Sequence, residues 1–473
     1  MNLALIIPEI FLFLWALLVL FVDFLTAEEK KHRLGPLSLV GIVITVVLVV
    51  ISGQGQVFGE MFSADYYSLS FAIIFLGSAF LAISTSIDFA RERIKHQGEY
   101  YALILLSTVG MMFLAASREL LSMYVSLELT TISLFVLSAY LKTELKSSEA
   151  GLKYMILGAA SSAILLYGIS LLYGITGTTV LKGIQAELVA SAFPGPLLVI
   201  SLVFIIAGFS FKLAAVPFHM WAPDVYEGAP TPITAYLSVA SKGAGLAAMV
   251  RVFFGSLLAV TSEWISLFMA LATMAMVLGN IVAIRQSNIK RMLAYSSIAQ
   301  VGYILVALSA ASELSTTSMI LYLLVYMFAN IGAFAVVIAF YNHSGTDEIC
   351  EYAGLSRRSP FLAISLVIFF LSLVGIPPLA GFVGKYLLFM AAIQKGYYWL
   401  VGVAVLTSVI SLFYYMNVVK QMYFRKPTKS DPVKVSWSLR LALVLSLIGV
   451  IAVGVYPNPF VSLISKAALV FVY

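Results

Sequence analysis

The chain has 473 residues, of which 62% are hydrophobic and 11% are charged, and its formal net charge is +6 at pH 7. Soluble domains are roughly a quarter charged, so this composition excludes an ordinary soluble fold and indicates a membrane protein. The basic residues are spread between apolar stretches, which disfavours a nucleic-acid-binding surface. A single cysteine, Cys350, excludes an iron–sulfur cluster held by four thiolates of this chain. The four histidines lack metal-ligand spacing, so we expect no bound metal.

Apolar stretches long enough to cross a hydrocarbon core of about 30 Å recur along the whole chain. The first begins without Lys or Arg, carries Glu9 and has no small-residue cleavage site. We therefore interpret it as a membrane helix and not as a signal peptide. Hydropathy predicts an all-α polytopic membrane fold with about fourteen transmembrane helices. These helices are expected near residues 3–25, 36–52, 69–88, 101–116, 120–141, 150–176, 196–214, 231–254, 264–284, 292–309, 316–341, 360–393, 400–422 and 436–456.

The loops between the predicted helices differ in basic charge. If they are numbered in chain order, the odd loops hold about twenty of the 28 Lys and Arg residues. The even loops and the tail together hold about five of them. By the positive-inside rule, the odd loops face the cytoplasm. We therefore expect a multi-pass protein of the cell inner membrane with both termini outside, which requires an even number of spans.

Four charged residues fall inside predicted spans. Lys212, Lys242 and Lys385 fit no loop, and Glu128 lies well inside predicted helix 5. A charge at the centre of a bilayer costs at least about 2.5 to 3.5 kcal/mol, so such residues usually face a bundle interior and mark an ion path. An inert ion pair between Glu128 and a lysine is the structural alternative. Three lysines cannot all be neutralised by one carboxylate, so we expect at least one lysine to exchange protons.

Two of the predicted spans are interrupted. Predicted helix 12 would be roughly 50 Å long if continuous, and a run of Gly and Pro breaks it just before Lys385. Predicted helix 7 ends just after Lys212 and leads into a stretch with several prolines and almost no charge. Discontinuous helices at corresponding places in two halves indicate an ion site in a transporter built from inverted repeats. Prolines that only kink structural helices are the alternative.

The breaks and charges predict two inverted five-helix repeats, helices 4–8 and helices 9–13. They divide the chain into an N-terminal part at 1–95, a first repeat at 96–256, a second repeat at 257–422 and a C-terminal part at 423–473. Uncharged polar residues in the spans are candidates for a hydrated path between the charged sites, although helix packing also explains each of them. The candidates are Ser241, Tyr295, Ser297, Gln300 and Tyr303.

Three stretches of sequence resemble the antiporter-like membrane subunits of respiratory complex I and of related cation/proton antiporters. They are KLAAVPFHMWAPDVYEGAPTP at 212–232, KRMLAYSSIAQVGY at 290–303 and GIPPLAGFVGKYLLF at 375–389. The resemblance covers nearly the whole chain. A lysine at position 385 and a short segment after the last helix are similar to the subunit N branch of this family.

The resemblance implies a proton-translocating subunit of an NADH-quinone oxidoreductase, in which quinone reduction elsewhere in the complex drives proton transfer. Glu128, Lys212, Lys242 and Lys385 match the family's proton-transfer residues on helices 5, 7, 8 and 12. The resemblance implies no cofactor in this chain, with FMN, iron–sulfur clusters and quinone held by other subunits. The implied partners are a neighbouring antiporter-like subunit, small membrane subunits and the lipid bilayer, but no nucleic acid.

Other functions stay open from the sequence. A subunit of a multi-subunit cation/proton antiporter or of a membrane-bound hydrogenase would share the stretch at 212–232, and only the redox partners would separate these cases. A stand-alone solute transporter is disfavoured because the midplane predicts a row of lysines instead of substrate-specific polar groups. A quinone-binding catalytic subunit is disfavoured because no redox or quinone-anchoring group is evident.

Overall fold

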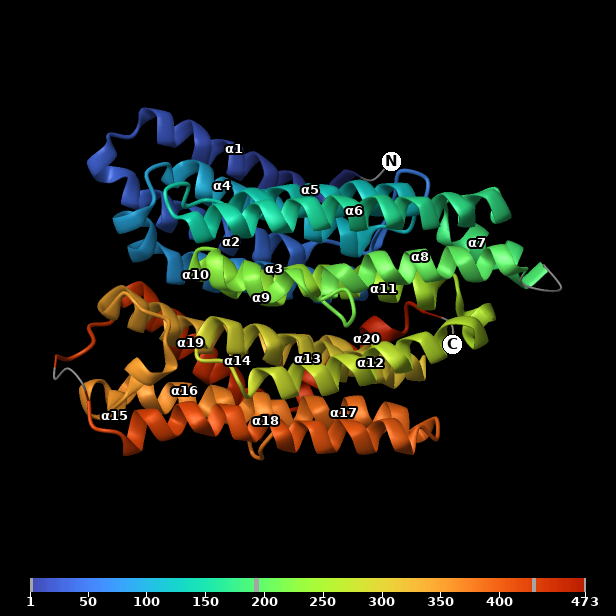
Figure 1. Ribbon diagram of the computed structural model, residues 1–473. Helices are drawn as coiled ribbons and strands as arrows, with labels where there is room; N and C mark the ends of the chain where they lie inside the picture. Colours follow the sequence, from blue (N-terminus) through green and yellow to red (C-terminus); the bar gives the residue numbers. More distant parts are fainter. Residues whose placement is uncertain (1–2, 191–194, 428–430, 472–473) are drawn as a thin grey trace.

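The computed structural model describes residues 3–190, 195–427 and 431–471, and its long helices run side by side in one bundle (Figure 1). Thirteen helical stretches of the described chain have the length and hydropathy needed to cross a membrane. In a bilayer a helix satisfies every backbone hydrogen bond internally, which is why these apolar runs fold as helices. The helices of these stretches are α1 (Ile7–Leu25), α2 (Leu34–Ile51), α3 (Tyr66–Arg93), α4 (Gln97–Ala116), α5 (Leu120–Ser138), α6 (Leu145–Thr176), α8 (Pro196–Leu213), α10 (Thr231–Tyr236), α11 (Lys242–Gly255), α12 (Thr261–Ala283), α13 (Ile289–Ala310), α14 (Glu313–Ser344), α18 (Tyr398–Phe424) and α19 (Trp437–Val455).

The remaining span is broken in two. Helices α16 (Pro360–Val374) and α17 (Ala380–Gln394) are apolar, but each is shorter than a full span. Counted as one discontinuous helix, the pair completes the fourteen spans that hydropathy predicts. Helices α10 and α11 form one span through the π-helical turn Leu237–Ser241.

Short elements connect the spans. Hydropathy did not predict them because they are too short or too polar to resemble a membrane helix. They are the 3-10 turns Leu3–Ile6, Glu28–Arg33, Leu258–Val260 and Ile349–Tyr352, the hairpin strands β1 (Gly55–Val57) and β2 (Phe62–Ala64), and the helices α7 (Leu181–Ala190), α9 (Trp221–Gly228), α15 (Leu355–Arg358) and α20 (Asn458–Ala468).

Helix α14 lies in the middle of the bundle (Figure 1) and packs against α3, α10, α13, α16, α17 and α19. Most of α13 and α14, and all of the stretch from Thr231 to Phe254, is buried inside the protein. The outer helices α1, α2, α6, α12, α18 and α19 are apolar, but only about a third of their residues are buried. Apolar residues on an outer face are expected when the solvent is lipid.

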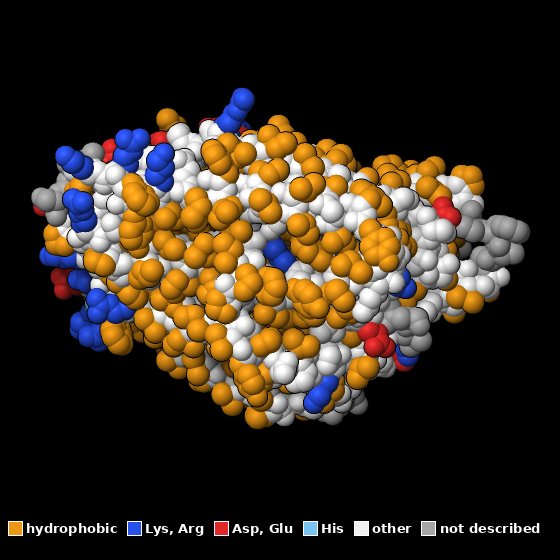
Figure 2. All heavy atoms as spheres, turned by 90° about the horizontal axis from the view of Figure 1, so that it is seen from below, with side chains coloured by type: hydrophobic (Ala, Val, Ile, Leu, Met, Phe, Trp, Pro, Cys, Tyr) orange, Lys and Arg blue, Asp and Glu red, His pale blue; other side chains and the backbone are white. Residues whose placement is uncertain are grey.

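Basic side chains gather at one end of the bundle. Figure 2 shows an apolar surface over the middle of one face, with Lys and Arg concentrated at the end on the left. The loops at this end precede α2, α4, α6, α13, α16 and α19, and we call it the basic end. The chain termini in Figure 1 lie toward the opposite end, as an even number of spans requires.

Helix boundaries follow caps that hydropathy does not register. Helix α3 starts three residues before the predicted stretch 69–88, because the Asp65 side chain accepts a hydrogen bond from Ser68 N at 2.8 Å. In turn, Ser68 Oγ accepts one from Asp65 N at 3.0 Å, which completes a capping box. The helix also continues to Arg93, so its last turn extends beyond the apolar run.

Candidate functional site

Lys212 lies in the last turn of α8, at the first helix break. Helix α8 ends where Ala214 adopts a left-handed conformation, and Ala215 N donates to Ser210 O at 2.9 Å, as in a Schellman motif. The Lys212 side chain is buried and donates from Nζ to Thr131 Oγ1 of α5. Its ammonium group also lies 5.8 Å from the centre of the Phe135 ring. The Lys212 side chain at this helix break therefore lies against α5.

Glu128 also belongs to α5, but it does not contact Lys212 directly. Its Oε1 accepts a hydrogen bond from Ser162 Oγ of α6, and the residue is half-buried. No ion pair within 4.0 Å joins Glu128 to a lysine in the described part of the chain, although Glu128 and Lys212 still interact electrostatically. The direct ion pair between Glu128 and a lysine, which the sequence left as the structural alternative, is therefore absent from the described residues. The hydroxyl groups of Ser162 and Thr131 contact Glu128 and Lys212 instead.

Lys242 follows the π-helical turn in the centre of the bundle. The residue is 3% exposed, and its Nζ donates to Ser297 Oγ of α13 at 2.6 Å. Ser297 Oγ also accepts a hydrogen bond from Tyr326 OH of α14 at 2.8 Å. The ammonium group lies 5.7 Å from the centre of the Tyr226 ring. A hydroxyl and an aromatic face thus replace water around this charge.

Helices α8 and α11 approach closely between the first two lysines. Gly245 lies one turn after Lys242, and a Cβ added there would come within 3.2 Å of Lys212 Cβ. The absence of a side chain at this glycine lets the backbones of the two helices pack close together. Lys212 and Lys242 are therefore carried by directly adjacent helices.

Lys385 lies one turn into α17, just after the second break. Helix α16 ends like α8, with Gly375 in a left-handed conformation and Ile376 N donating to Leu371 O at 3.0 Å. Lys385 Nζ donates to Val374 O at 2.9 Å and to Ser408 Oγ of α18 at 2.8 Å. Its ammonium group lies 4.2 Å from the centre of the Tyr303 ring.

A line of polar groups connects the surroundings of Lys242 to those of Lys385. Tyr326, which donates to Ser297, stacks on Tyr322 with ring centres 6.5 Å apart. Tyr322 OH donates to Gln300 Oε1, and Gln300 Nε2 donates to Leu373 O at 3.1 Å. Leu373 immediately precedes Val374, whose carbonyl accepts from Lys385. The line crosses the bundle from α11 through α13 and α14 to α17.

Three of the five predicted polar residues take part. Ser297 and Gln300 belong to this line, and the Tyr303 ring lies at its end beside Lys385. Tyr303 also accepts a hydrogen bond from Asn280 Nδ2 at 3.1 Å. Ser241 is buried beside Lys242, whereas Tyr295 is half-buried and packs against the apolar core. The sequence reasoning missed Thr131, Ser162, Tyr322, Tyr326 and Asn280, because many uncharged polar residues lie in the spans and nothing in the sequence shows which of them lie near the charged sites.

Ion pairs tie the segment after the first break to the basic end. Asp224 of α9 contacts Lys153 at 2.6 Å and Arg291 at 2.9 Å. Glu227 contacts Lys146 at 2.7 Å and Arg291 at 2.9 Å. Partial burial would raise the pKa of both carboxyl groups, but hydrogen bonds from these cations outweigh burial and hold each pKa below its usual value. Helix α9 is thereby fixed to α6 and α13.

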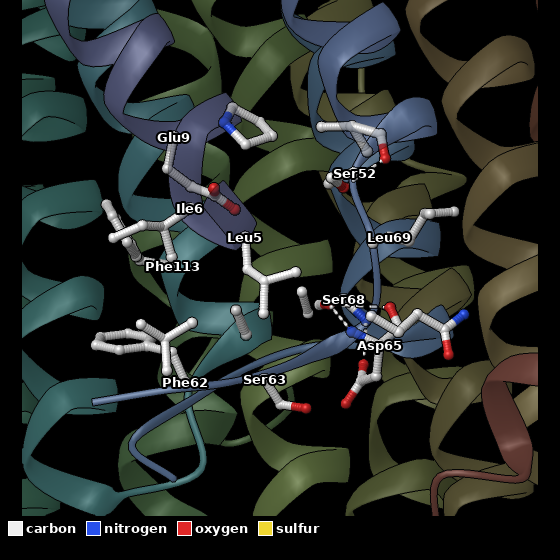
Figure 3. Close-up of a pocket in the computed structure, with 18 residues that line it drawn as sticks. Leu5, Ile6, Glu9, Ser52, Phe62, Ser63, Asp65, Ser68, Leu69 and Phe113 are labelled. Carbon is white, nitrogen blue, oxygen red and sulfur yellow. Dashed lines mark hydrogen bonds between the residues drawn. The ribbon is translucent and has the colours of Figure 1, made fainter. Parts of the chain in front are cut away.

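A buried ion pair lies at the opposite end. Arg251 Nη2 contacts Asp65 Oδ1 at 2.8 Å, and Arg251 Nε donates to Ala115 O at 3.0 Å. Figure 3 shows Glu9 and Asp65 at a cavity of about 40 Å³, where the start of α1 meets the turn before α3. Glu9 Oε2 is buried and has no hydrogen-bond partner among the described residues. These groups do not belong to the line of polar groups between Lys242 and Lys385.

The fold and the buried lysines define a membrane protein of the antiporter-like class. A sequence profile of the family described as NADH:quinone oxidoreductase/Mrp antiporter, TM matches residues 117–411. The chain belongs to this family. The match spans both helix breaks and the four charged residues Glu128, Lys212, Lys242 and Lys385.

Relatives of known name agree with this assignment. NADH-quinone oxidoreductase subunit N of Moorella thermoacetica is 50% identical over 408 residues, which cover 86% of each chain. Subunit N of Desulforamulus reducens is 42% identical over 472 residues, which cover 99% of each chain. Among solved structures, a chain of respiratory complex I from Thermus thermophilus with bound aureothin is similar with a TM-score of 0.83. It is 30% identical, and the similarity covers 96% of this chain and 99% of that one.

Proposed function

We propose that the chain is the proton-carrying subunit N of an NADH-quinone oxidoreductase of the cell inner membrane. The observation that carries the proposal is the line of polar groups between Lys242 and Lys385, in which hydrogen bonds join Lys242 to Tyr326 and Tyr322 to Leu373, and a ring contact at 6.5 Å joins the two tyrosines. A buried lysine that donates to a hydroxyl can release a proton to it and later regain one, and water would have to carry the proton between Tyr326 and Tyr322 and from Gln300 to Lys385, where no hydrogen bond joins the groups. Glu128 and Lys212 would act at the other end of the same path.

The family relatives support the place of this chain in a larger enzyme. Both relatives are named as subunits of NADH-quinone oxidoreductase. We propose that flavin, iron–sulfur clusters and quinone reside in other subunits, and that a neighbouring antiporter-like subunit and small membrane subunits are the partners. Quinone reduction elsewhere would then shift the charges around Glu128 and Lys212, and this shift would drive proton release near Lys385.

Two architectural proposals follow. The basic end would face the cytoplasm and both termini would lie outside, in keeping with the positive-inside rule. The predicted spans 4–8, which run from α4 to α11, would form a first repeat at 96–256. The predicted spans 9–13, which run from α12 to α18, would form a second repeat at 257–422, inverted relative to the first. The two breaks support this division, because α8 and α16 occupy the fourth position of their repeats and both end in a left-handed residue.

Replacement of Lys385 tests the proposal. Arginine cannot release its proton near neutral pH, so Lys385→Arg should assemble but lose most proton pumping, as should Lys385→Met. Vesicles that contain the purified complex would report the quinone reduction rate and the proton gradient from one preparation. Lys395→Met, which removes an exposed lysine ten residues further on, is the control. Wild-type pumping by Lys385→Arg would leave Lys385 only a fixed electrostatic role.

The same preparation distinguishes the proposed function from the main alternative. A subunit of a cation/proton antiporter would be purified without a flavin or iron–sulfur spectrum, and its transport would run without NADH. A quinone-reducing complex requires both. Mass spectrometry of the co-purified chains would identify the partners directly.

A further inference from the structure

A large pocket lies at the basic end between α4, α5 and α6, and its lining includes none of the four candidate proton-transfer residues. Its volume is about 680 Å³, within the range of about 300–1,000 Å³ that is typical of small-molecule sites. One part of the lining is charged and comes from the loops before α4 and α6. The other part is apolar and comes from the facing sides of α4, α5 and α6. The pocket is thus amphipathic.

The charged part favours an anion. Arg93, Lys95 and Lys142 line the pocket together with one carboxylate, Glu99, so these residues carry a net charge of +2. Arg93 is already engaged, because it contacts Glu144 at 3.9 Å and donates to Tyr341 OH at 3.2 Å. Lys95 and Lys142 are exposed and have no ion pair within 4.0 Å among the described residues. These two lysines are free to bind an anionic group.

The apolar part favours a hydrocarbon chain. Val136 of α5 and Leu152 and Met155 of α6 line the pocket, and each is about half exposed. The exposed apolar residues Ile132 and Ile156 continue the same outer faces toward the middle of the bundle. A soluble anion would gain nothing from this surface, whereas an acyl chain would bury it.

We propose that the pocket binds an anionic phospholipid of the basic-end leaflet, with its phosphate between Lys95 and Lys142. One acyl chain would lie against Val136 and Leu152. Basic pockets between transmembrane helices on the cytoplasmic side bind lipid headgroups in this way. The inference is independent of the proposed proton path, since it rests on a different set of residues.

Phe135 would connect the bound lipid to the buried lysines. Its ring lines the pocket, and the Lys212 ammonium group lies 5.8 Å from the ring centre. The ring is held in place by Tyr154, at 4.8 Å between ring centres, and by Gly158, where a Cβ would approach Phe135 to 2.3 Å. A lipid in the pocket would therefore cover the ring that packs over Lys212 and keep water away from it.

Native mass spectrometry of the full chain tests this proposal. The chain in mild detergent would be titrated with phosphatidylglycerol and phosphatidylcholine of identical acyl chains, and bound lipids would be counted. We expect wild type to retain phosphatidylglycerol preferentially. Lys95→Gln/Lys142→Gln should bind it about tenfold or more weakly, because each basic residue contributes about 1 kcal/mol to anionic lipid binding. Val136→Trp, which fills the chain site without changing charge, should also lose the lipid.

The matched control is Lys30→Gln/Arg285→Gln, which removes two exposed cations from the same end but outside the pocket. It should keep the wild-type preference. Equal retention by the Lys95/Lys142 variant and wild type would overturn the proposal, as would an equal loss in the control. If wild type binds neither lipid preferentially and Lys95 cross-links to another polypeptide in the native membrane, the pocket is a protein interface and the lipid proposal fails.

Discussion

Gly375 at the second helix break offers a test of how exactly Lys385 must be held. Gly375 has φ +94°, a conformation that L-residues rarely adopt, and a Cβ there would lie 3.1 Å from Lys385 Cδ. Gly375→Ala therefore combines two effects. The backbone strain costs about 1–2 kcal/mol. The contact must also lengthen to about 3.5 Å or more, which displaces the lysine side chain.

That displacement should weaken the hydrogen bonds of Lys385 Nζ to Val374 O and Ser408 Oγ, now 2.9 and 2.8 Å long. Losing one hydrogen bond of a charged group costs about 1.5 to 3 kcal/mol, which disfavours the protonated lysine about tenfold or more. We expect Gly375→Ala to assemble, to lose some thermal stability and to pump far fewer protons per quinone reduced. Vesicles with a pH-sensitive dye would measure this ratio.

Gly396→Ala is the matched control for strain alone. Gly396 lies just after α17 with φ +80°, and a Cβ there would meet no atom within 4 Å. It should lose similar thermal stability and keep the wild-type pumping ratio. If the two variants pump alike, the position of Lys385 does not control transfer, and the reasoning from its contacts is wrong.

Three further predictions concern other parts of the chain. Glu128→Gln should lower proton pumping without loss of assembly, since it keeps the hydrogen bond from Ser162 but removes the charge near Lys212. An unchanged proton-to-electron ratio in vesicles would favour a structural role for Glu128. Cysteines placed at the two ends, in a chain with the exposed Cys350 replaced by serine, should react with a membrane-impermeant reagent from outside; labelling of either end only from inside would refute the topology. Asp224 has a pKa below its usual value, so its ion pairs stabilise the protein above the unfolded-state pKa of about 4 and lose this effect as pH falls through the folded value. The thermal stability of wild type should therefore exceed that of Asp224→Asn at pH 7, and the difference should vanish on acidification; a constant difference would show that the charge is not responsible.

The sequence could predict the spans and the four buried charges because each depends on local information. An apolar run of sufficient length must be a helix in lipid, and a lysine within such a run is conspicuous. The break before Lys385 was equally visible from its Gly and Pro residues. The contacts were not predictable, because Thr131 and Tyr326 reach their lysines from helices distant in sequence. Their roles depend on helix packing, which hydropathy does not encode.

The same limit applies to the partners of the buried lysines. An ion pair of Glu128 with a lysine was the structural alternative, since an unpaired charge is costly in lipid. The structure supplies other partners. Lys385 donates to the carbonyl of Val374, the last residue of α16, and Lys212 lies in the last turn of α8. The last carbonyls of a helix lack intrahelical partners and carry partial negative charge.

A helix that ends inside the membrane therefore creates an acceptor for an ammonium group without burying a second full charge. This arrangement suits a proton carrier better than a salt bridge would. A carboxylate at contact distance would hold the lysine in its charged form, whereas a carbonyl and a hydroxyl can accept from an ammonium group and remain satisfied by a neutral amine, which still donates. If Lys385 carries protons as proposed, the break before it would serve two requirements at once. It would offset the cost of a charge in the bilayer, and it would let Val374 O and Ser408 Oγ accept from the lysine in both protonation states.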